Sequence, residues 1–240
     1  MNRLMAVSII ALVVLGSASA EVTTYFGQDL VGSGTTDPVS SWPNALTASN
    51  SFQSMLVGVG TETFEGFADG TAMNGQTLNF GAAGTATFSG SMAIQSGYST
   101  GRFAISGSKY VEGSTGSFGI TFSEEIAAFG FYGTDIGDFT GQVTVTTANG
   151  VSHIYTIPHH IGNGSNSDPG DGSALFWGII DTTNPFTSVS ISNSASGTDY
   201  FGFDDMTIGG IENVVPLPGA VLLVARDGQA VRSYASMVDP

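Results

Sequence analysis

The stretch "GSFGITFSEEIAAFGFYG", Gly116–Gly133, decides the fold class. Large apolar residues alternate in it with small or polar ones, which is the pattern of strands that bury one face. Phe118, Ile120 and Phe122 share one parity, whereas Phe129 and Phe131 share the other. We therefore expect strands on either side of a solvated turn at "SEE", with each aromatic set filling one layer of a core.

Outward from this stretch, short apolar-alternating pieces run from Phe52 to Gly210 and are separated by Gly, Asn, Asp or Ser. The clearest hairpin is Gln142–Pro158, where Asn149-Gly150 predicts a type I′ turn. No long stretch has the helical period of apolar residues, and no tandem repeat is present. The sequence therefore predicts an all-β fold, an antiparallel jelly-roll-like β-sandwich.

The composition restricts the possible partners. Five Lys and Arg stand against 20 Asp and Glu, for a net charge of −15 in 240 residues. Such a surface repels nucleic acid and anionic lipid, and it favours divalent cations or neutral polar partners. Cysteine is absent, so the chain has neither disulfides nor a thiolate zinc site.

The N-terminus predicts export. The first 20 residues, "MNRLMAVSIIALVVLGSASA", have Arg3, a short apolar run and a small-residue cleavage site, as a signal peptide does. We expect a secreted or cell-surface protein with no stable membrane span after cleavage. The predicted organisation is a signal peptide at 1–20, a lead-in without regular structure at 21–50, a β-sandwich at 51–211, and a linker and tail at 212–240.

The stretch "YFGFDDMTIGG", Tyr200–Gly210, places two acids inside an apolar strand. Strand parity puts Asp204 on the face of Met206 and Asp205 on the face of Phe203, so one acid points towards the core. A buried carboxylate must be protonated, paired with a base, given backbone donors or bound to a cation. Bases are scarce in this chain, which leaves backbone donors or a cation as the main alternatives.

Two segments resemble the first and last strands of jelly-roll sandwiches of the carbohydrate-binding-module type. They are "TFEGF", Thr63–Phe67, and "YFGFDDMTIG", Tyr200–Gly209. The resemblance implies that Glu65, Asp204 and Asp205 lie side by side and help to hold a structural calcium ion. Hard oxygen ligands in an acid-rich chain suit calcium. The alternative is one exposed acid, with the other accepting backbone hydrogen bonds.

The segment "VVPLPGAVLLV", Val214–Val224, resembles the start of the PEP-CTERM sorting signal of exosortase-bearing bacteria. That resemblance implies an exported bacterial protein. The tail departs from the family pattern, because Leu217 replaces the usual Glu, the apolar run stops at Ala225 and no basic cluster follows. We therefore expect a short degenerate tail or a stiff Pro-x-Pro linker.

Catalytic signatures are absent from the sequence. The loop that begins at His159-His160 matches no metal-protease spacing, and no nucleophile elbow or Walker loop occurs. Sugar-binding sandwiches instead present exposed rings beside polar groups. The candidate ligand-binding residues are Tyr132, Asp135 and Trp177.

The sequence thus predicts a non-catalytic surface or extracellular-matrix protein that binds a polysaccharide or a cell-surface glycan. A secreted hydrolase acting on polysaccharide and a purely structural coat protein are the alternatives.

Overall fold

The computed structural model describes residues 22–31, 37–114, 116, 118–164, 168–194 and 199–215. All of its helices and strands lie in one compact unit, Ala20–Val215. The predicted signal peptide and the residues after Val215 lie outside the described residues.

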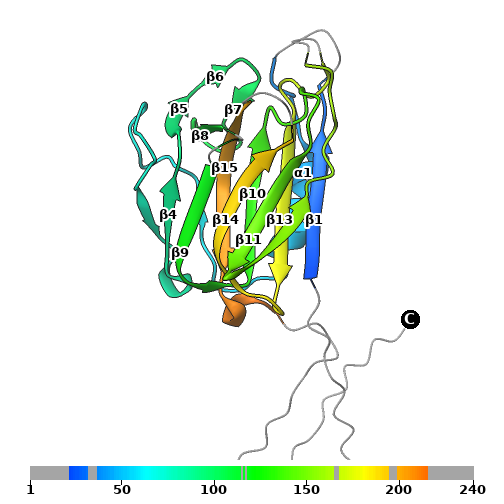
Figure 1. The fold of residues 1–240 in the computed structure, drawn as a ribbon. Helices are drawn as coiled ribbons and strands as arrows, with labels where there is room; N and C mark the ends of the chain where they lie inside the picture. Colours follow the sequence, from blue (N-terminus) through cyan, green and yellow to red (C-terminus); the bar gives the residue numbers. More distant parts are fainter. Residues whose placement is uncertain are drawn as a thin grey trace, which may run out of the picture. The chain divides into compact units, whose positions relative to one another are not determined.

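Two antiparallel sheets form a sandwich (Figure 1). The first sheet has seven strands. Six of them follow the order β1-β13-β10-β15-β8-β5, and β2 lies outside this order and pairs with β15. Its strands are β1 (Val22–Asp29), β2 (Thr61–Glu62), β5 (Met92–Ser96), β8 (Lys109–Ser114), β10 (Ala128–Thr134), β13 (Ala174–Asp181) and β15 (Tyr200–Gly209). The prediction of an all-β antiparallel sandwich is confirmed.

The second sheet has six strands in the order β12-β11-β14-β9-β4-β3. Its strands are β3 (Thr77–Asn79), β4 (Thr85–Ser89), β9 (Phe118–Ile126), β11 (Val143–Asn149), β12 (Val151–Thr156) and β14 (Phe186–Asn193). The remaining elements are a small hairpin and three helices: β6 (Tyr98–Ser99), β7 (Arg102–Phe103), α1 (Pro43–Gln53), η1 (Gly81–Ala83) and η2 (Ile211–Asn213).

The main core lies between the two sheets, and Gly116–Gly133 supplies both of its layers. Strand β9 belongs to the second sheet and β10 to the first. Phe118, Ile120 and Phe122 therefore face Phe129 and Phe131 across the core. The rings of Phe122 and Phe129 are 6.3 Å apart between centroids. The two-layer prediction is confirmed, but the expected turn at "SEE" is wrong, because β9 continues through these residues to Ile126.

The predicted hairpin is present as β11 and β12, with Asn149 paired to Val151. Its turn differs from the prediction. Gly150 has a φ of 77°, but Asn149 does not have a positive φ. Since a type I′ turn needs positive φ at both central residues, that turn type is wrong.

The interpretation of residues 21–50 as a lead-in without regular structure is wrong. Strand β1 pairs with β13 along its whole length, from Val22 opposite Asp181 to Asp29 opposite Ala174. Helix α1 follows and begins at Pro43, a residue favoured in the first helical turn. Turn-rich sequence on both sides of these elements obscured them.

Helix α1 covers the outer face of the first sheet and forms a second core there. Phe52 is fully buried, with its ring 5.5 Å from that of Phe176. Gly130 on β10 and Gly178 on β13 make room for it, because an added Cβ would lie 2.8 Å and 2.9 Å from the Phe52 ring. Both faces of β10 and β13 are therefore buried.

Candidate functional site

The acidic pair of β15 lies at a β-bulge. Tyr132 of β10 is opposite Asp204, whereas Gly130 is opposite Thr207. One residue of β10 thus faces two of β15, and Asp205 has a left-handed φ of 47°. Because a bulge reverses strand parity, the large apolar residues before and after the acids face the same core: Phe201, Phe203, Met206 and Ile208. The assignment of Met206 and Phe203 to opposite faces is therefore wrong.

The bulge occurs where β15 changes its neighbour. Strand β8 pairs with Tyr200–Phe203, and β2 pairs with Met206 and Thr207. The segment before β8 enters this gap, where Asp204 accepts the backbone N–H groups of Ile105 at 2.8 Å and Ser106 at 3.2 Å. Its other oxygen accepts the N–H of Asp205 at 2.8 Å. The Asp204 carboxylate thus replaces the carbonyl partners that a regular strand would supply.

Glu65 lies near the same segment because β2 pairs with the last strand. It accepts the backbone N–H groups of Ser108 at 2.8 Å and Lys109 at 2.6 Å, and the Ser108 hydrogen bond lowers the pKa of Glu65. Asp205 accepts the hydroxyl of Ser106 at 2.6 Å. The three acids predicted to lie together therefore all contact residues 106–109 or their immediate neighbours.

Burial determines the electrostatics of the pair. It raises the pKa of Asp204 to about 8, with a further contribution from the charge of Asp205. Burial also raises the pKa of Asp205, and Glu65 adds to that shift. Among the described residues, no three Asp, Glu or His side chains are arranged as a metal cage. The hydrogen bonds match the alternative of backbone donors, and the calcium ion at Glu65, Asp204 and Asp205 stays a prediction.

A second group of buried acids lies where β10 ends and β13 begins. Asp135 follows β10 with a left-handed φ of 65° and donates its N–H to the carbonyl of Ser173 at 3.0 Å. One oxygen of its carboxylate binds Arg102 at 2.9 Å, and the other accepts the N–H of Gly172 at 3.2 Å. Burial and the nearby Asp138 carboxylate raise the pKa of Asp135 to about 8. Asp135 was predicted as a ligand-binding residue, but its grouping with other buried acids was not predicted.

The proposed exposed rings are buried, so that part of the prediction is wrong. Tyr132 is 5% exposed and packs beneath α1, 5.1 Å from the ring of Phe176. Trp177 is fully buried in the main core, 6.3 Å from the ring of Phe131. Asp135 is 3% exposed. These residues cannot form an external sugar platform, because α1 covers Tyr132, the two sheets enclose Trp177, and Asp135 is held by Arg102 and Gly172.

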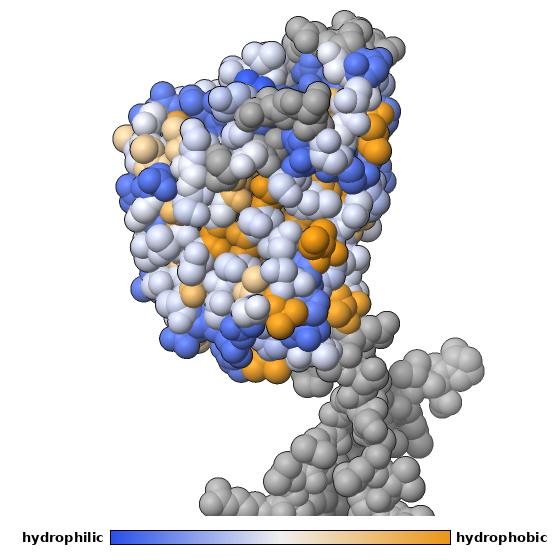
Figure 2. Space-filling view, in the orientation of Figure 1, coloured by the Kyte–Doolittle hydropathy of each residue, from blue (hydrophilic) through white to orange (hydrophobic). Residues whose placement is uncertain are grey.

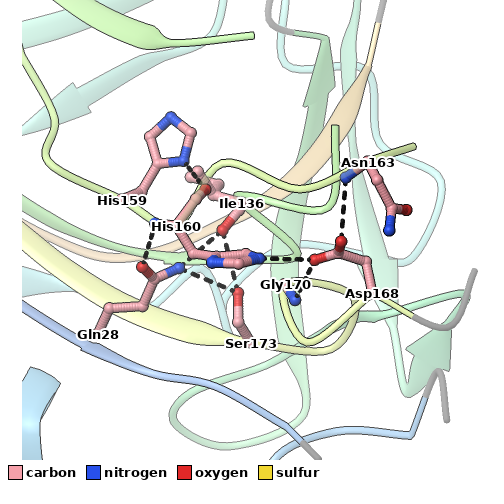
Figure 3. Close-up of polar contacts among 8 residues, drawn as sticks. All are labelled: Gln28, Ile136, His159, His160, Asn163, Asp168, Gly170 and Ser173. Carbon is pink, nitrogen blue, oxygen red and sulfur yellow. Dashed lines mark hydrogen bonds and ion pairs between the residues drawn. The ribbon is translucent and has the colours of Figure 1, made fainter. Parts of the chain in front are cut away.

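The histidine loop is held by its own polar contacts (Figure 3). The Nε2 atom of His160 lies 2.9 Å from Asp168, which also accepts the N–H groups of Asn163 and Gly170, each at 3.0 Å. Gln28 of β1 accepts the N–H of His160 at 2.7 Å and donates to the carbonyl of Ile136 at 2.9 Å. These bonds tie β1 to the loops that follow β10 and β12.

His159 is a buried part of the same loop. Its Nε2 accepts the backbone N–H of Val143 at 2.9 Å, and its ring lies 5.6 Å from that of Phe139. Burial lowers the pKa of His159, an effect that its contact with the carbonyl of His160 opposes. The ring therefore holds the start of β11 in place.

The outer face of the second sheet carries two uncharged rows of residues, one across all six strands and one across five of them. One row runs through Thr77, Thr87, Thr121, Ser188, Ala148 and Ser152. The next runs through Ser89, Gly119, Ser190, Thr146 and Ile154. We call these eleven residues the hydroxyl face. Figure 2 shows pale residues of intermediate hydropathy over this side, with several hydrophobic patches among them and strongly hydrophilic residues mostly towards its margins.

The hydroxyl face is well defined because its residues are fixed by strand pairing. The hydroxyls of Thr77 and Thr87 are 2.9 Å apart. Beside the second row, those of Thr144 and Ser192 are 3.0 Å apart. No aromatic ring marks this surface in the sequence, so it was not among the predicted sites. The alternating Thr and Ser of "VTVTT" and "TSVSIS" were the available signal.

Comparisons with known proteins give few matches. No family model matches the chain, and no curated protein matches it. Among solved structures, the chain is similar to the K2 cleaved adhesin domain of Lys-gingipain, with a TM-score of 0.37 and 17% sequence identity. That match covers 62% of this chain and 97% of the adhesin-domain chain. Among the described residues, no helix is long and apolar enough to cross a membrane.

Proposed function

We propose that this chain is an exported, non-catalytic surface or extracellular-matrix protein that binds a neutral polysaccharide through the hydroxyl face. The supporting observation is the absence of charge from both rows of that face in a chain with a net charge of −15. An uncharged face suits a partner whose recognition depends on hydroxyl groups rather than on ion pairs.

The chemistry of the face suits a polyhydroxylated ligand. Each Ser or Thr hydroxyl donates one hydrogen bond and accepts two, as sugar hydroxyls also do. Threonine has restricted χ1 rotamers in a strand, so ordering these side chains on binding costs little entropy. The exposed hydroxyls of Thr121 and Ser190 lie near the middle of the face.

The same face disfavours the two alternatives from the sequence. Glycoside hydrolysis needs two carboxylates on either side of one sugar bond, and neither row contains a carboxylate. At the margin, Glu125 binds the side chain of Asn149 at 2.6 Å. A coat protein that assembles by apolar contacts needs large buried anchors, whereas Ile154 is the one large apolar residue in the two rows.

Export and calcium belong to the same proposal. The sequence of residues 1–20 supports export, and the likeness of Val214–Val224 to a PEP-CTERM signal supports a bacterial surface setting. A structural calcium ion at Glu65, Asp204 and Asp205 is supported by the gathering of these acids around residues 106–109. Such an ion would join β2 and β15 in a chain without disulfides.

Binding to neutral insoluble polysaccharides, measured by co-sedimentation, tests the function. We expect the Thr121→Glu/Ser190→Glu variant to bind at least about tenfold more weakly, because desolvating an unpaired carboxylate costs more than about 1.4 kcal/mol. Asn50→Glu on α1 is the matched control and should bind like the wild type. If the wild type binds no neutral polysaccharide, or if the double variant binds as well as the control, the proposal is wrong.

A further inference from the structure

Two buried carboxylates outside the β15 bulge converge on one point. Gly101 lies in the turn between β6 and β7 with a φ of 85°. A Cβ placed on it would lie 2.1 Å from Oδ1 of Asp135 and 2.5 Å from Oδ1 of Asp171. Both oxygens therefore pack against the Gly101 backbone and, from these two distances, lie no more than 4.6 Å from each other.

The Asp171 carboxylate is buried without sufficient donors. The residue is 3% exposed, and its Oδ1 accepts no hydrogen bond. Asp138, three residues after Asp135, also has a buried Oδ1 atom that accepts none. Buried polar atoms in folded proteins nearly always have a partner, so these two oxygens need one, which for Asp171 is either a bound cation or a proton shared with Asp135.

The local charges point to a cation. Arg102 contacts Asp135 at 2.9 Å and Glu112 at 2.8 Å, so its single positive charge is shared between two acids. Burial raises the pKa of Asp171 and of Asp138, and the charge of Arg102 only partly opposes these shifts. Hard carboxylate oxygens in a base-poor setting suit calcium, which takes six to eight oxygen ligands and accepts backbone carbonyls and water among them.

We propose that Asp135 and Asp171, with Asp138 beside them, bind a calcium ion at the end of the sheet where β10 stops and β13 starts. The ion would be separate from the one predicted at Glu65, Asp204 and Asp205. Backbone carbonyls or water complete its coordination. Two carboxylate ligands are therefore enough, although the described residues contain no set of three acidic or histidine side chains arranged as a metal cage.

The site joins three loops that are distant in sequence. Asp135 comes directly after β10, Asp171 lies three residues before β13, and Gly101 belongs to the β6–β7 turn. An ion that contacts all three stabilises the folded state by mass action. It does the work of a cross-link in a chain that has no cysteine.

Melting temperatures in millimolar calcium and in chelator test the site. For the wild type we expect calcium to raise the melting temperature by about 5–10 °C at a hundredfold excess over the dissociation constant. Asp171→Asn should lose all or part of that rise, and Asp204→Asn should keep at least part of it. Glu124→Gln removes an exposed acid and should behave as the wild type. An unchanged response in Asp171→Asn, or complete loss in Asp204→Asn alone, would overturn the proposal.

Terbium binding gives a readout that does not depend on stability. Burial raises the pKa of Tyr110 to about 12, and the carboxylates of Glu112 and Asp135 add to that shift, so the phenol lies near the site. We expect terbium emission excited through tyrosine, displaced by calcium, weaker in Tyr110→Phe, and lost or reduced in both Asp171→Asn and Asp138→Asn. Terbium emission that is equal in wild type and Asp171→Asn contradicts the site, and an equal thermal response to magnesium contradicts its assignment to calcium.

Discussion

The carboxylate of Asp204 accepts the backbone N–H of Ile105 at 2.8 Å, across 99 residues of sequence. This contact closes the gap that opens when β15 exchanges β8 for β2 as its neighbour. A strand that changes partners leaves backbone donors without ladder acceptors. The acidic pair is therefore part of the architecture of the sheet, in addition to any ion that it holds.

Replacing Asp204 tests this architectural role. Asp204→Ala leaves three backbone N–H groups without their acceptor, and we expect it to lower the free energy of unfolding by about 2–4 kcal/mol. Asp204→Asn keeps one acceptor oxygen and should cost about 1 kcal/mol. Urea unfolding in chelator measures both changes without a contribution from calcium. Equal losses in the two variants would contradict the role of the carboxylate as an acceptor.

Asp205 tests the bulge itself. Its φ of 47° is accessible to Gly and Asn but strained for a β-branched residue. We expect Asp205→Val to be less stable than Asp205→Gly by about 1–2 kcal/mol, although valine is favoured in regular strands. Both variants lose the hydrogen bond with Ser106, which makes them a matched pair for thermal unfolding. A more stable valine variant would mean that β15 is regular at this point.

Short-range patterns in the sequence predicted the strands and the hairpin whose formation depends on neighbouring residues. Alternation in Gly116–Gly133 predicted both layers of the core, and Asn149-Gly150 marked the β11–β12 hairpin. The resemblance of Thr63–Phe67 to a first strand is wrong, because this segment is a turn; it lies near β15 only because β2, just before it, pairs with that strand. Each of the confirmed features depends on residues that are close in sequence or on one strand pair.

The failures involve contacts between distant segments. Tyr132 is buried because α1 lies over β10, and no pattern within β10 indicates that cover. The bulge at Asp205 depends on the change from β8 to β2, which requires the whole sheet order. Asp135 and Asp171 meet only because β10 and β13 are neighbours in the sheet. Sequence spacing alone contains none of this information.

His159 makes the stability of the protein depend on pH. Its pKa is lowered in the folded state, so below its ordinary value of about 6.5 the unfolded chain binds more protons, and stability falls as the pH falls. Asp135 and Asp204, whose pKa values are raised, act in the opposite direction. The comparison must therefore be made against a variant that changes only the imidazole.

The expected outcome is a pH-dependent difference between wild type and His159→Gln. At about pH 7.5 the wild type should be more stable, because the neutral ring accepts the N–H of Val143. Between about pH 6.5 and 5 that advantage should shrink as protonation of His159 begins to favour the unfolded chain. Urea unfolding at several pH values measures the difference. A constant advantage across this range would show that His159 does not titrate differently in the folded state.

Phe52 tests whether α1 is an integral part of the domain. Gly178→Ala brings a Cβ to 2.9 Å from its ring and should cost about 1–3 kcal/mol through overpacking. In the Phe52→Leu background the same change should cost at least about 0.5 kcal/mol less, because the smaller side chain leaves room and the two sites are in contact. Gly202→Ala is the control, since its Cβ would meet Thr134 and Tyr110 instead. The loss of stability caused by Gly202→Ala should be the same whether residue 52 is Phe or Leu. Additive costs for Gly178→Ala and Phe52→Leu in urea unfolding would mean that α1 does not pack on β13 as described.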